Sequence, residues 1–418
     1  MKLTSWGRGR MKWDTKMVAG GTPPTSDDSF WLDGDDPQGV PFVAISDMSR
    51  RTSVREAAKS LSSAGMRSRN MPVGSPGTLL LAMYASVGEL AFLDIEATWN
   101  QAILGITPCD SVDPRFLGYV LADMKQDLLR DVRSNTQDNL NAGQIGDLWF
   151  QKPSIQIQRQ IADFLDLEIA SIDNLMVQQK RLVDLLRERR STVIDRAVWN
   201  GLDSDSELTP TGIGPAPIAP SHWLRLRNKN IFSEAANLSE DGSEELLTVS
   251  HLTGITPRSE KNVNMFEAES NVGYRVVQPR DLVINTMWAW MGALGVSSIN
   301  GVVSPAYGVY RPHSDLDFDP KYFGYLYRSR PYIVEMTRHS RGIWSSRFRL
   351  YPEVFLRLNI VVPPVNEQQQ IAAHLDEQTA KIDRLIAEAK KIVELANERR
   401  AALITAAVTD KIDISGAA

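Results

Sequence analysis

Hydrophobic residues recur at intervals of three, four and seven in two stretches of the chain, one near its middle and one near its end. The first stretch contains Ile161, Leu165, Ile172, Leu175 and Leu182, and the second contains Leu375, Ile382, Leu385 and Ile392. Apolar residues at this spacing form a stripe along one side of an α-helix. Because the spacing keeps a heptad period, it predicts two long helices that pair as a coiled coil, with Leu165, Ile172, Leu175, Ile382 and Leu385 in its core.

The two predicted helices are copies of each other. The sequence QIADFLDLEIASIDNL (160–175) returns as QIAAHLDEQTAKIDRL (370–385), an offset of 210 residues. The match continues without a gap to the triplet Glu-Arg-Arg at 188–190 and 398–400. A repeated triplet on a helix surface is either a solvated face or a contact for a partner or for the other helix. Arg189 and Arg399 are therefore candidates for docking, together with the heptad residues.

The segments before each helix have a different pattern. Short apolar stretches bounded by Gly, Pro, Asn and Asp predict strands at 40–45, 78–84, 245–250, 281–288 and 301–312. Residues 113–130 and 319–329 predict short helices, and the Pro- and Gly-rich residues 209–223 predict a linker.

Framework pieces of these segments also repeat, although the residues between them diverge. A Met-aromatic-Ala-x-x-Gly motif occurs in 77–92 and in 281–296. The sequence thus predicts an α+β protein made by tandem duplication of two mixed α/β domains separated by two long helices. The predicted boundaries are 1–150 for the first domain, 151–202 for the first helix, 203–357 for the second domain and 358–418 for the second helix.

Composition and charge limit the class of protein. Hydrophobic residues make up 43% of the 418 residues, which is ordinary for a globular protein. The single cysteine, Cys109, excludes an intramolecular disulfide and a cysteine-based zinc cluster. No run of 18 apolar residues is present and the first residues do not look like a signal peptide, so we expect a cytoplasmic protein without a membrane span. The net charge of −5 argues against a nucleic-acid-binding protein unless its cations are clustered.

Two clusters of cations do occur, one in each domain. The first lies within 50–69 and contains Arg50, Arg51, Arg55, Lys59, Arg67 and Arg69. The second lies within 328–349 and contains Arg328, Arg330, Arg338, Arg341, Arg347 and Arg349, with the polar residue Ser340 among them. Arginine binds phosphates, and arginine and serine side chains also reach base edges. These residues are the candidates for DNA contact, and a solvated basic surface is the alternative. In the first domain the amide-rich segment 133–144 corresponds in position to the second cluster.

The sequence contains no motif of an enzyme that acts on DNA. It lacks an Asn-Pro-Pro-aromatic or Asp-Pro-Pro-aromatic methyltransferase motif and a phosphate-binding GxxxxGK[ST] loop. The five histidines are scattered, with no metal-binding spacing. We therefore expect a protein without catalytic activity or a cofactor of its own, in preference to a self-contained methyltransferase or nuclease. A coiled-coil adaptor that does not read DNA stays open as an alternative.

Three further motifs stand out: GGTPPT (20–25), PPVNEQQQIAAHLD (363–376) and its weaker copy KPSIQIQRQIADFLD (152–166). With these motifs and the duplicated helices, the chain resembles the specificity subunit of type I restriction–modification systems. The pattern Pro-Pro-x-x-Glu-Gln-x-x-Ile-x-x-x-Leu-Asp, duplicated at the ends of two dissimilar domains, identifies this family more specifically than a helical repeat alone does.

The resemblance implies a DNA-reading scaffold. In that family each variable domain is a target-recognition domain that reads one half of a bipartite, asymmetric site in double-stranded DNA. The resemblance further implies that the long helices pair antiparallel, that two methyltransferase (M) subunits dock on them, and that endonuclease/translocase (R) subunits join the complex. S-adenosylmethionine and ATP are then expected on those partner subunits.

Overall fold

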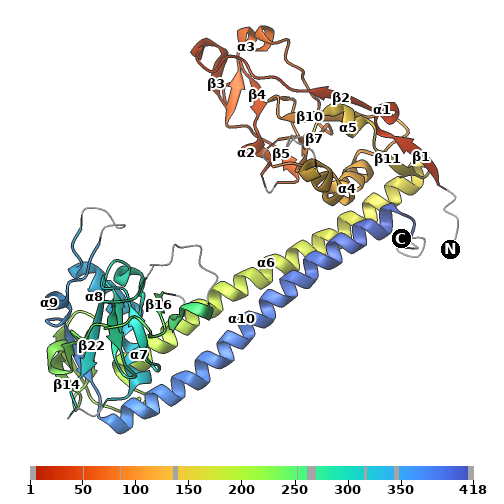
Figure 1. The fold of residues 1–418 in the computed structure, drawn as a ribbon. Coiled ribbons are helices and arrows are strands. Elements are labelled where there is room, and N and C mark those ends of the chain that lie inside the picture. Colours follow the sequence, from red (N-terminus) through yellow and green to blue (C-terminus); the bar gives the residue numbers. More distant parts are fainter. Residues whose placement is uncertain are drawn as a thin grey trace. The chain divides into compact units, whose positions relative to one another are not determined.

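The computed structural model describes residues 6–49, 51–84, 86–134, 140–251, 253–260, 270–314, 318–342 and 348–412. The chain divides into two compact units, drawn in Figure 1. Unit 1 comprises Met1–Gln179 and Lys391–Ala418, and unit 2 comprises Lys180–Lys390. Each unit therefore combines one variable domain with part of both long helices. No helix in the described part of the chain is long and apolar enough to cross a membrane.

Unit 1 is built on two sheets and a ribbon of two strands. The five-stranded sheet has the order β2-β10-β7-β8-β5, the four-stranded sheet has the order β3-β6-β4-β9, and β1 pairs with β11. The strands are β1 (Gly7–Arg10), β2 (Thr15–Ala19), β3 (Trp31–Asp33), β4 (Val40–Val43), β5 (Ser53–Val54), β6 (Lys59–Leu61), β7 (Leu79–Ala82), β8 (Leu90–Leu93), β9 (Thr98–Trp99), β10 (Ile103–Pro108) and β11 (Trp149–Lys152). The helices are α1 (Met11–Asp14), η1 (Asp28–Phe30), α2 (Ile45–Met48), α3 (Ser63–Ser68), α4 (Pro114–Ser134), α5 (Ala142–Gly146) and the first part of α6 (Ile155–Asn200).

Unit 2 has a smaller central sheet, with the order β15-β22-β19-β20, and several two-stranded ribbons. Its strands are β12 (Leu208–Ile213), β13 (Ala216–Pro220), β14 (Leu224–Arg227), β15 (Phe232–Glu234), β16 (Leu247–Ser250), β17 (Gly254–Pro257), β18 (Arg275–Val277), β19 (Leu282–Asn285), β20 (Leu294–Val296), β21 (Gly301–Val303), β22 (Tyr307–Pro312) and β23 (Asn359–Val362). Its helices are η2 (Asn228–Asn230), η3 (Arg258–Glu260), η4 (Ala289–Met291), α7 (Pro320–Tyr327), α8 (Arg330–His339), α9 (Pro352–Phe355) and the first part of α10 (Val365–Val408).

Both units have the same internal arrangement, in which a helix of the variable domain packs between the domain's sheet and a long helix. In unit 1 the core contains Leu79 of β7, Phe116 of α4 and Leu165 of α6. In unit 2 it contains Ile284 of β19 and Phe323 of α7, joined by a set of long-helix residues: Val198, Ile371 and Leu375. Each of these side chains is almost completely buried, so the long helices belong to the hydrophobic cores of the domains.

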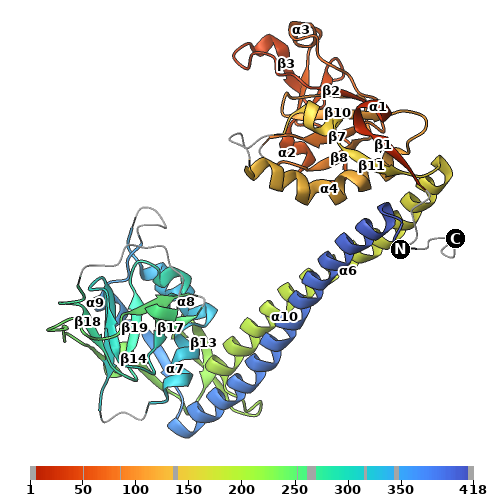
Figure 2. The same ribbon diagram turned by 45° about the vertical axis from the view of Figure 1, so that its right-hand side comes forward.

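The two long helices run antiparallel to each other within each unit. In unit 1, Ile161 and Leu165 near the start of α6 share a core with Ile404 and Val408 near the end of α10. In unit 2 the end of α6 shares a core with the start of α10, as both ribbon views show (Figures 1 and 2). This direction agrees with the direction that the family resemblance implied.

One strand in each domain carries a repeat that the sequence analysis missed. Trp6-x-Arg8-x-Arg10 precedes and forms β1, and Trp223-x-Arg225-x-Arg227 precedes and forms β14. Gly7–Arg10 pairs antiparallel with Trp149–Lys152, and Leu224–Arg227 pairs in the same register with Asn359–Val362. Each of these strands thus pairs with the strand that leads into a long helix, so the duplication includes β1 and β14, although the strands β12 and β13 precede β14 in the second domain.

Two expectations about local structure are wrong. The Pro- and Gly-rich residues expected to form a linker fold into the hairpin of β12 and β13. Thr211 Oγ1 bonds the carbonyl of Ala216 across this hairpin and accepts from the Ile213 N–H, and Gly212 supplies a positive φ of 71°. The same residue types therefore make a closed turn here instead of a flexible segment.

The second correction concerns the apolar stripe of the long helices. Ile161, Leu165, Ile172, Leu375 and Ile382 are buried as expected, with exposed fractions of at most 6%. Leu175 and Leu385 were expected in the core, but they are 43% and 45% exposed. Leu182 and Ile392 of the same stripe are also exposed. The reason is geometric, because the stripe is wider than the surface that one partner helix can cover.

Candidate nucleic-acid interface and its anchorage

The predicted cations of unit 1 fall on two different sheets. Arg51 and Arg55 flank β5, at the edge of the five-stranded sheet, and Arg67 and Arg69 lie at the end of α3, beside the four-stranded sheet. All four are exposed. The Arg55 guanidinium donates a hydrogen bond to Asp94 at 3.0 Å and thereby lowers the pKa of that carboxyl group. The structure therefore splits this predicted cluster into two pairs, and Arg50 lies outside the described residues.

The predicted cations of unit 2 are brought closer together. Arg338 lies in the last turn of α8, and Arg341 and Arg349 form an antiparallel bridge with N–H to carbonyl distances of 3.0 and 2.9 Å. The three arginines are exposed. The Ser340 hydroxyl donates its hydrogen bond to the carbonyl of Met336, in the last turn of α8. Arg347 lies outside the described residues.

Unit 2 also contains a basic cleft of about 1190 Å³ that the sequence analysis did not predict. Six cations line it, and they come from α6, from the turn before β19, from α7 and the residue that follows it, and from α10: Arg187, Arg190, Arg280, Lys321, Arg328 and Lys390. Its described lining holds only three carboxylates, of which Asp376 pairs with Lys321 and Asp383 pairs with Arg190. Burial, together with the charge of Arg190, lowers the pKa of Arg328. The excess of cations suits a phosphate or another anionic surface.

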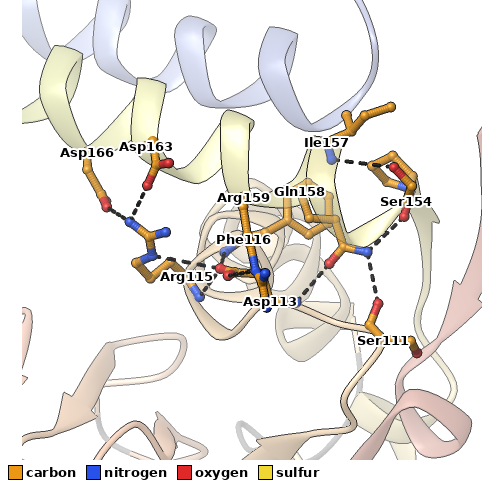
Figure 3. Close-up of polar contacts among 11 residues, drawn as sticks. Ser111, Asp113, Arg115, Phe116, Ser154, Ile157, Gln158, Arg159, Asp163 and Asp166 are labelled. Carbon is orange, nitrogen blue, oxygen red and sulfur yellow. Dashed lines mark hydrogen bonds and ion pairs between the residues drawn. The ribbon is translucent and has the colours of Figure 1, made fainter. Parts of the chain in front are cut away.

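Each domain is anchored on its long helix by a set of polar contacts. Figure 3 shows the site in unit 1, where Gln158 of α6 is fully buried. Its Oε1 accepts from the Asp113 N–H at 2.8 Å, and its Nε2 donates to the carbonyls of Ser111 and Pro153 at 3.1 and 2.8 Å. Asp113 in turn accepts from the Phe116 N–H and so caps the start of α4. One glutamine thus fixes the start of α4 against the start of α6.

A carboxylate two turns further along α6 holds the next part of α4. Asp166 accepts from Arg115 Nη1 at 2.7 Å and from the Tyr119 hydroxyl at 2.6 Å, and Asp163 pairs with the same guanidinium at 2.8 Å. Partial burial, together with the hydrogen bond to Asp166, raises the pKa of Tyr119 above its ordinary value. The hydroxyl therefore keeps its proton and stays a donor to the carboxylate.

Unit 2 repeats this anchorage. Gln368 of α10 is buried, its Oε1 accepts from the Asp319 N–H at 3.0 Å, and its Nε2 donates to the carbonyl of Pro363 at 2.9 Å. Asp319 caps α7 through the Tyr322 N–H. Asp376 accepts from Lys321 at 2.6 Å and from the Tyr325 hydroxyl at 2.8 Å.

The repeated anchorage explains the terminal signature on which the family resemblance rests. In the copy at 363–376, Gln368 and Asp376 are the two polar anchors. Ile371 and Leu375, which lie between them in the sequence, are buried in the core. Sequence reasoning did not assign Gln158, Gln368, Asp166 or Asp376 to a site. The signal was present, because all four recur at the offset of 210 residues.

The Glu-Arg-Arg triplets contribute an ion pair between the two helices in each unit. In unit 2, Arg190 makes two hydrogen bonds with Asp383, at 2.9 and 3.2 Å. In unit 1, Arg400 pairs with Asp173 at 3.4 Å. Arg399 approaches Glu168 to 3.7 Å, whereas Arg189 is exposed. The third residue of the triplet, which the sequence analysis did not single out, is therefore the one that joins the helices in both copies.

The described residues contain no cluster of three or more His, Cys, Asp or Glu side chains that could hold a metal ion. The polar groups of the anchorage are bonded to one another or to the backbone. The arrangement fixes each variable domain on a long helix and presents exposed cations on both domains.

Comparisons with known proteins find similarity to specificity proteins of type I restriction systems. Residues 16–181 match the model of the type I restriction modification DNA specificity domain. The chain is 24% identical over 197 residues to the type I restriction enzyme MjaIX specificity subunit of Methanocaldococcus jannaschii. That match covers 45% of this chain and 44% of the relative, so the chain spans less than half of the relative's length.

Two solved structures share the fold over almost the entire chain. One belongs to a study of complex assembly and conformational transition of a type I R-M system, with a TM-score of 0.69, 15% identity and coverage of 99% of this chain and 100% of the other. The second is the HsdS subunit from Thermoanaerobacter tengcongensis, with a TM-score of 0.54, 13% identity and coverage of 98% of both chains.

Proposed function

We propose that the whole chain is the sequence-recognition subunit of a type I restriction–modification complex, because residues 16–181 match the model of the type I restriction modification DNA specificity domain. Each variable domain reads one half of a bipartite, asymmetric site in double-stranded DNA. The long helices carry the two domains and set the spacing between the half-sites. The subunit has no catalytic activity of its own.

The observation that carries this proposal is the repeated anchorage. Two domains with diverged sequences are fixed to two copies of one helix by the same buried glutamine and the same carboxylate–tyrosine pair. A common frame with different domains is what an asymmetric two-part site requires, because the frame sets the geometry and the domains set the sequence. A coiled-coil adaptor without DNA reading gives no reason for two separate variable domains.

The exposed cations support DNA as the ligand. Arg338, Arg341 and Arg349 of unit 2 and the exposed arginines of unit 1 supply the positive charge that phosphate contacts need, although the whole chain carries a net charge of −5. The acidic total leads us to expect weak DNA binding by the isolated subunit, with further phosphate contacts supplied by partner subunits.

Exposed leucines and isoleucine on the long helices support two identical partners. In unit 1 they are Leu175, Ile392 and Leu395, and in unit 2 they are the equivalent residues at the offset of 210: Leu385, Leu182 and Leu185. Their exposed fractions lie between 39% and 54%. Apolar side chains exposed at equivalent positions favour the same contact made twice. We assign these positions to two methyltransferase subunits, which bind S-adenosylmethionine and are joined by ATP-dependent endonuclease/translocase subunits.

Mapping of modified adenines tests this function. The chain is co-expressed with its candidate methyltransferase, and the host DNA is sequenced for methylated adenine with and without this gene. The proposal predicts a split motif with a fixed spacer, modified on both strands and lost when the gene is deleted. Absence of modification, although both proteins are produced and form a complex, would favour the adaptor.

A further inference from the structure

The basic cleft of unit 2 is lined on one side by the two long helices and on the other by the variable domain. The helices contribute three of its six cations and the domain contributes the other three, Arg280, Lys321 and Arg328. The three carboxylates of its described lining are engaged within the protein, since Asp319 caps α7 and Asp376 and Asp383 form ion pairs. Six cations against three carboxylates make the cleft positive, although the whole chain carries a net charge of −5.

One aromatic ring that unit 1 places over its domain helix has no counterpart in unit 2. Gly118 of α4 and Gly324 of α7 are equivalent residues of the motifs PRFLGYVL and PKYFGYLY. A Cβ added at Gly118 would lie 3.0 Å from the ring of Phe92, whereas a Cβ added at Gly324 would meet nothing within 4 Å. The residue equivalent to Phe92 is Val296, because each of them pairs with the first residue of the neighbouring strand, β7 or β19. The smaller side chain leaves space over α7, and both Gly324 and Val296 line the cleft.

Arg280 lines the cleft from a backbone conformation that favours glycine. Its φ is 79°, and its N–H donates to the carbonyl of Ser297 at 2.8 Å. The equivalent residue in unit 1 is Gly77, which also follows a proline, also lies two residues before the start of the strand and has a φ of 90°. The guanidinium of Arg280 lies 5.6 Å from the centre of the Phe318 ring, a cation–π contact that restrains it. An arginine in a strained conformation, where the other copy has glycine, indicates that its side chain has a use.

Arg328 is a second cation that unit 1 lacks, since the equivalent residue of α4 is Ala122. The Arg328 side chain is half-buried, and its Nη2 donates to the carbonyl of His251 at 2.9 Å. Burial and the charge of Arg190 together lower the pKa of its guanidinium. Two cations held near each other repel, and an anion bound between them removes the repulsion. The wall of the cleft is therefore prepared for a negatively charged ligand.

Resting on the proposed function, we propose that this cleft receives phosphates of the DNA backbone beside the half-site that the second domain reads. Its volume of about 1190 Å³ exceeds the roughly 300–1,000 Å³ of pockets for small molecules, so a charged chain fits it better than a single small anion. Arginine suits phosphate because its planar fork donates two parallel hydrogen bonds. Two identical methyltransferase subunits fit the cleft less well. They require equivalent contacts in both units, whereas Arg280, Val296 and Arg328 all differ from their equivalents.

The test uses the complex with its methyltransferase and a duplex that carries the motif found for the wild type. Binding is measured over a salt series from about 50 to 200 mM. Arg280→Gly introduces the residue of unit 1 at a φ that favours glycine, so the domain keeps its fold. Because each phosphate contact contributes about 0.9 to the slope of log affinity against log salt, we expect that slope to fall by about one. The relative loss of affinity should be the same for a duplex of unrelated sequence, and the methylated motif should stay unchanged.

Two further variants separate the cleft from charge in general. Val296→Phe supplies the ring that covers Gly118 in unit 1 and removes no charge, and we expect it to weaken binding and to reduce the slope as well. Arg357→Ala is the matched control, because Arg357 is an exposed arginine of unit 2 that does not line the cleft. We expect its affinity and slope to equal those of the wild type.

Four results overturn the inference. Wild-type affinity and slope of either Arg280→Gly or Val296→Phe would show that DNA does not enter the cleft, and an equal effect of Arg357→Ala would reduce the result to net charge. A changed methylated motif would make Arg280 a base contact. Loss of the methyltransferase from the variant complexes, measured by size-exclusion chromatography, would make the cleft a protein contact. Failure of the proposed function would look different, because the wild-type complex itself would then show no split motif.

Discussion

The Tyr325 hydroxyl donates to Asp376 at 2.8 Å, and the Tyr119 hydroxyl donates to Asp166 at 2.6 Å in the other copy. In each pair the tyrosine comes from a helix of the variable domain, and the aspartate comes from a long helix. The two pairs occupy equivalent places in domains that have otherwise diverged. The attachment of the domains has therefore been kept while their surfaces have changed, which makes the attachment a target for separate tests in the two copies.

Replacing one anchoring carboxylate should disturb one domain only. Asp376→Asn removes the charge that pairs with Lys321 and weakens the hydrogen bond from Tyr325. Since the Lys321 side chain is largely exposed, we expect a loss of only about 1–2 kcal/mol in the free energy of unfolding of unit 2. Asp166→Asn is the equivalent change in unit 1. Hydrogen exchange resolved by peptide should show faster opening of the affected domain alone, and equal effects on both domains would contradict the assignment.

The buried glutamine should matter more than its exposed neighbour. Gln368→Ala leaves the Asp319 N–H and the Pro363 carbonyl without their buried partner, and we expect a loss of about 1–3 kcal/mol for each group left unpaired. Gln369→Ala changes the next residue, which is exposed, and should stay within about 0.5 kcal/mol of the wild type. Urea unfolding measures both values. Similar losses for the two variants would show that the amide bonds do not stabilise the domain.

Unit 2 should lose stability at alkaline pH. Burial raises the pKa of Tyr322 and of Tyr327 well above the ordinary value of 10.0, because the phenolate would lie in an apolar core. A group whose pKa is raised in the folded state contributes its full stability below the unfolded pKa and loses it as the pH rises above that value. The melting temperature of unit 2 should therefore fall above about pH 10, and Tyr322→Phe should reduce the slope of that fall. A slope unchanged by Tyr322→Phe would contradict the prediction.

The exposed apolar positions of the long helices should govern assembly and not folding. Leu185→Glu and Leu395→Glu place a charge at equivalent positions that are 54% and 50% exposed. We expect the free energy of unfolding to stay within about 0.5 kcal/mol and the co-purification with the methyltransferase to be lost. Leu167→Glu is the control, because Leu167 is 74% exposed and its equivalent at the offset of 210 is Glu377. Assembly that survives both test variants would exclude these leucines from the interface.

Much of the frame was predictable from sequence. The heptad spacing gave the two long helices, although α6 and α10 each extend beyond the repeated segment. The strands expected at 78–84 and 281–288 are present as β7 and β19, and the helices expected at 113–130 and 319–329 are present as α4 and α7. These elements were accessible because each of them has an apolar pattern of its own.

The contacts between elements were not predictable in the same way. The heptad spacing did not show that Leu175 and Leu385 are exposed, because exposure depends on which neighbours cover the stripe. The role of Gln158 depends on the start of α4 lying above it, which no local pattern reveals. The Trp-x-Arg-x-Arg repeat of β1 and β14 is only five residues long and lies at an offset of 217. The long helices repeat at 210 and the Met-aromatic-Ala-x-x-Gly pieces at 204, so this repeat does not align at either of those offsets.

The central claim is that each variable domain independently reads one half of a split DNA site. The most direct test replaces residues 1–150 with the corresponding domain of a related chain, keeping the anchors Gln158 and Asp166, and maps methylated adenines in cells that contain the methyltransferase. The account predicts that one half of the motif changes while the other half and the spacer length stay the same. A motif that is unchanged, or one in which both halves change, would contradict it.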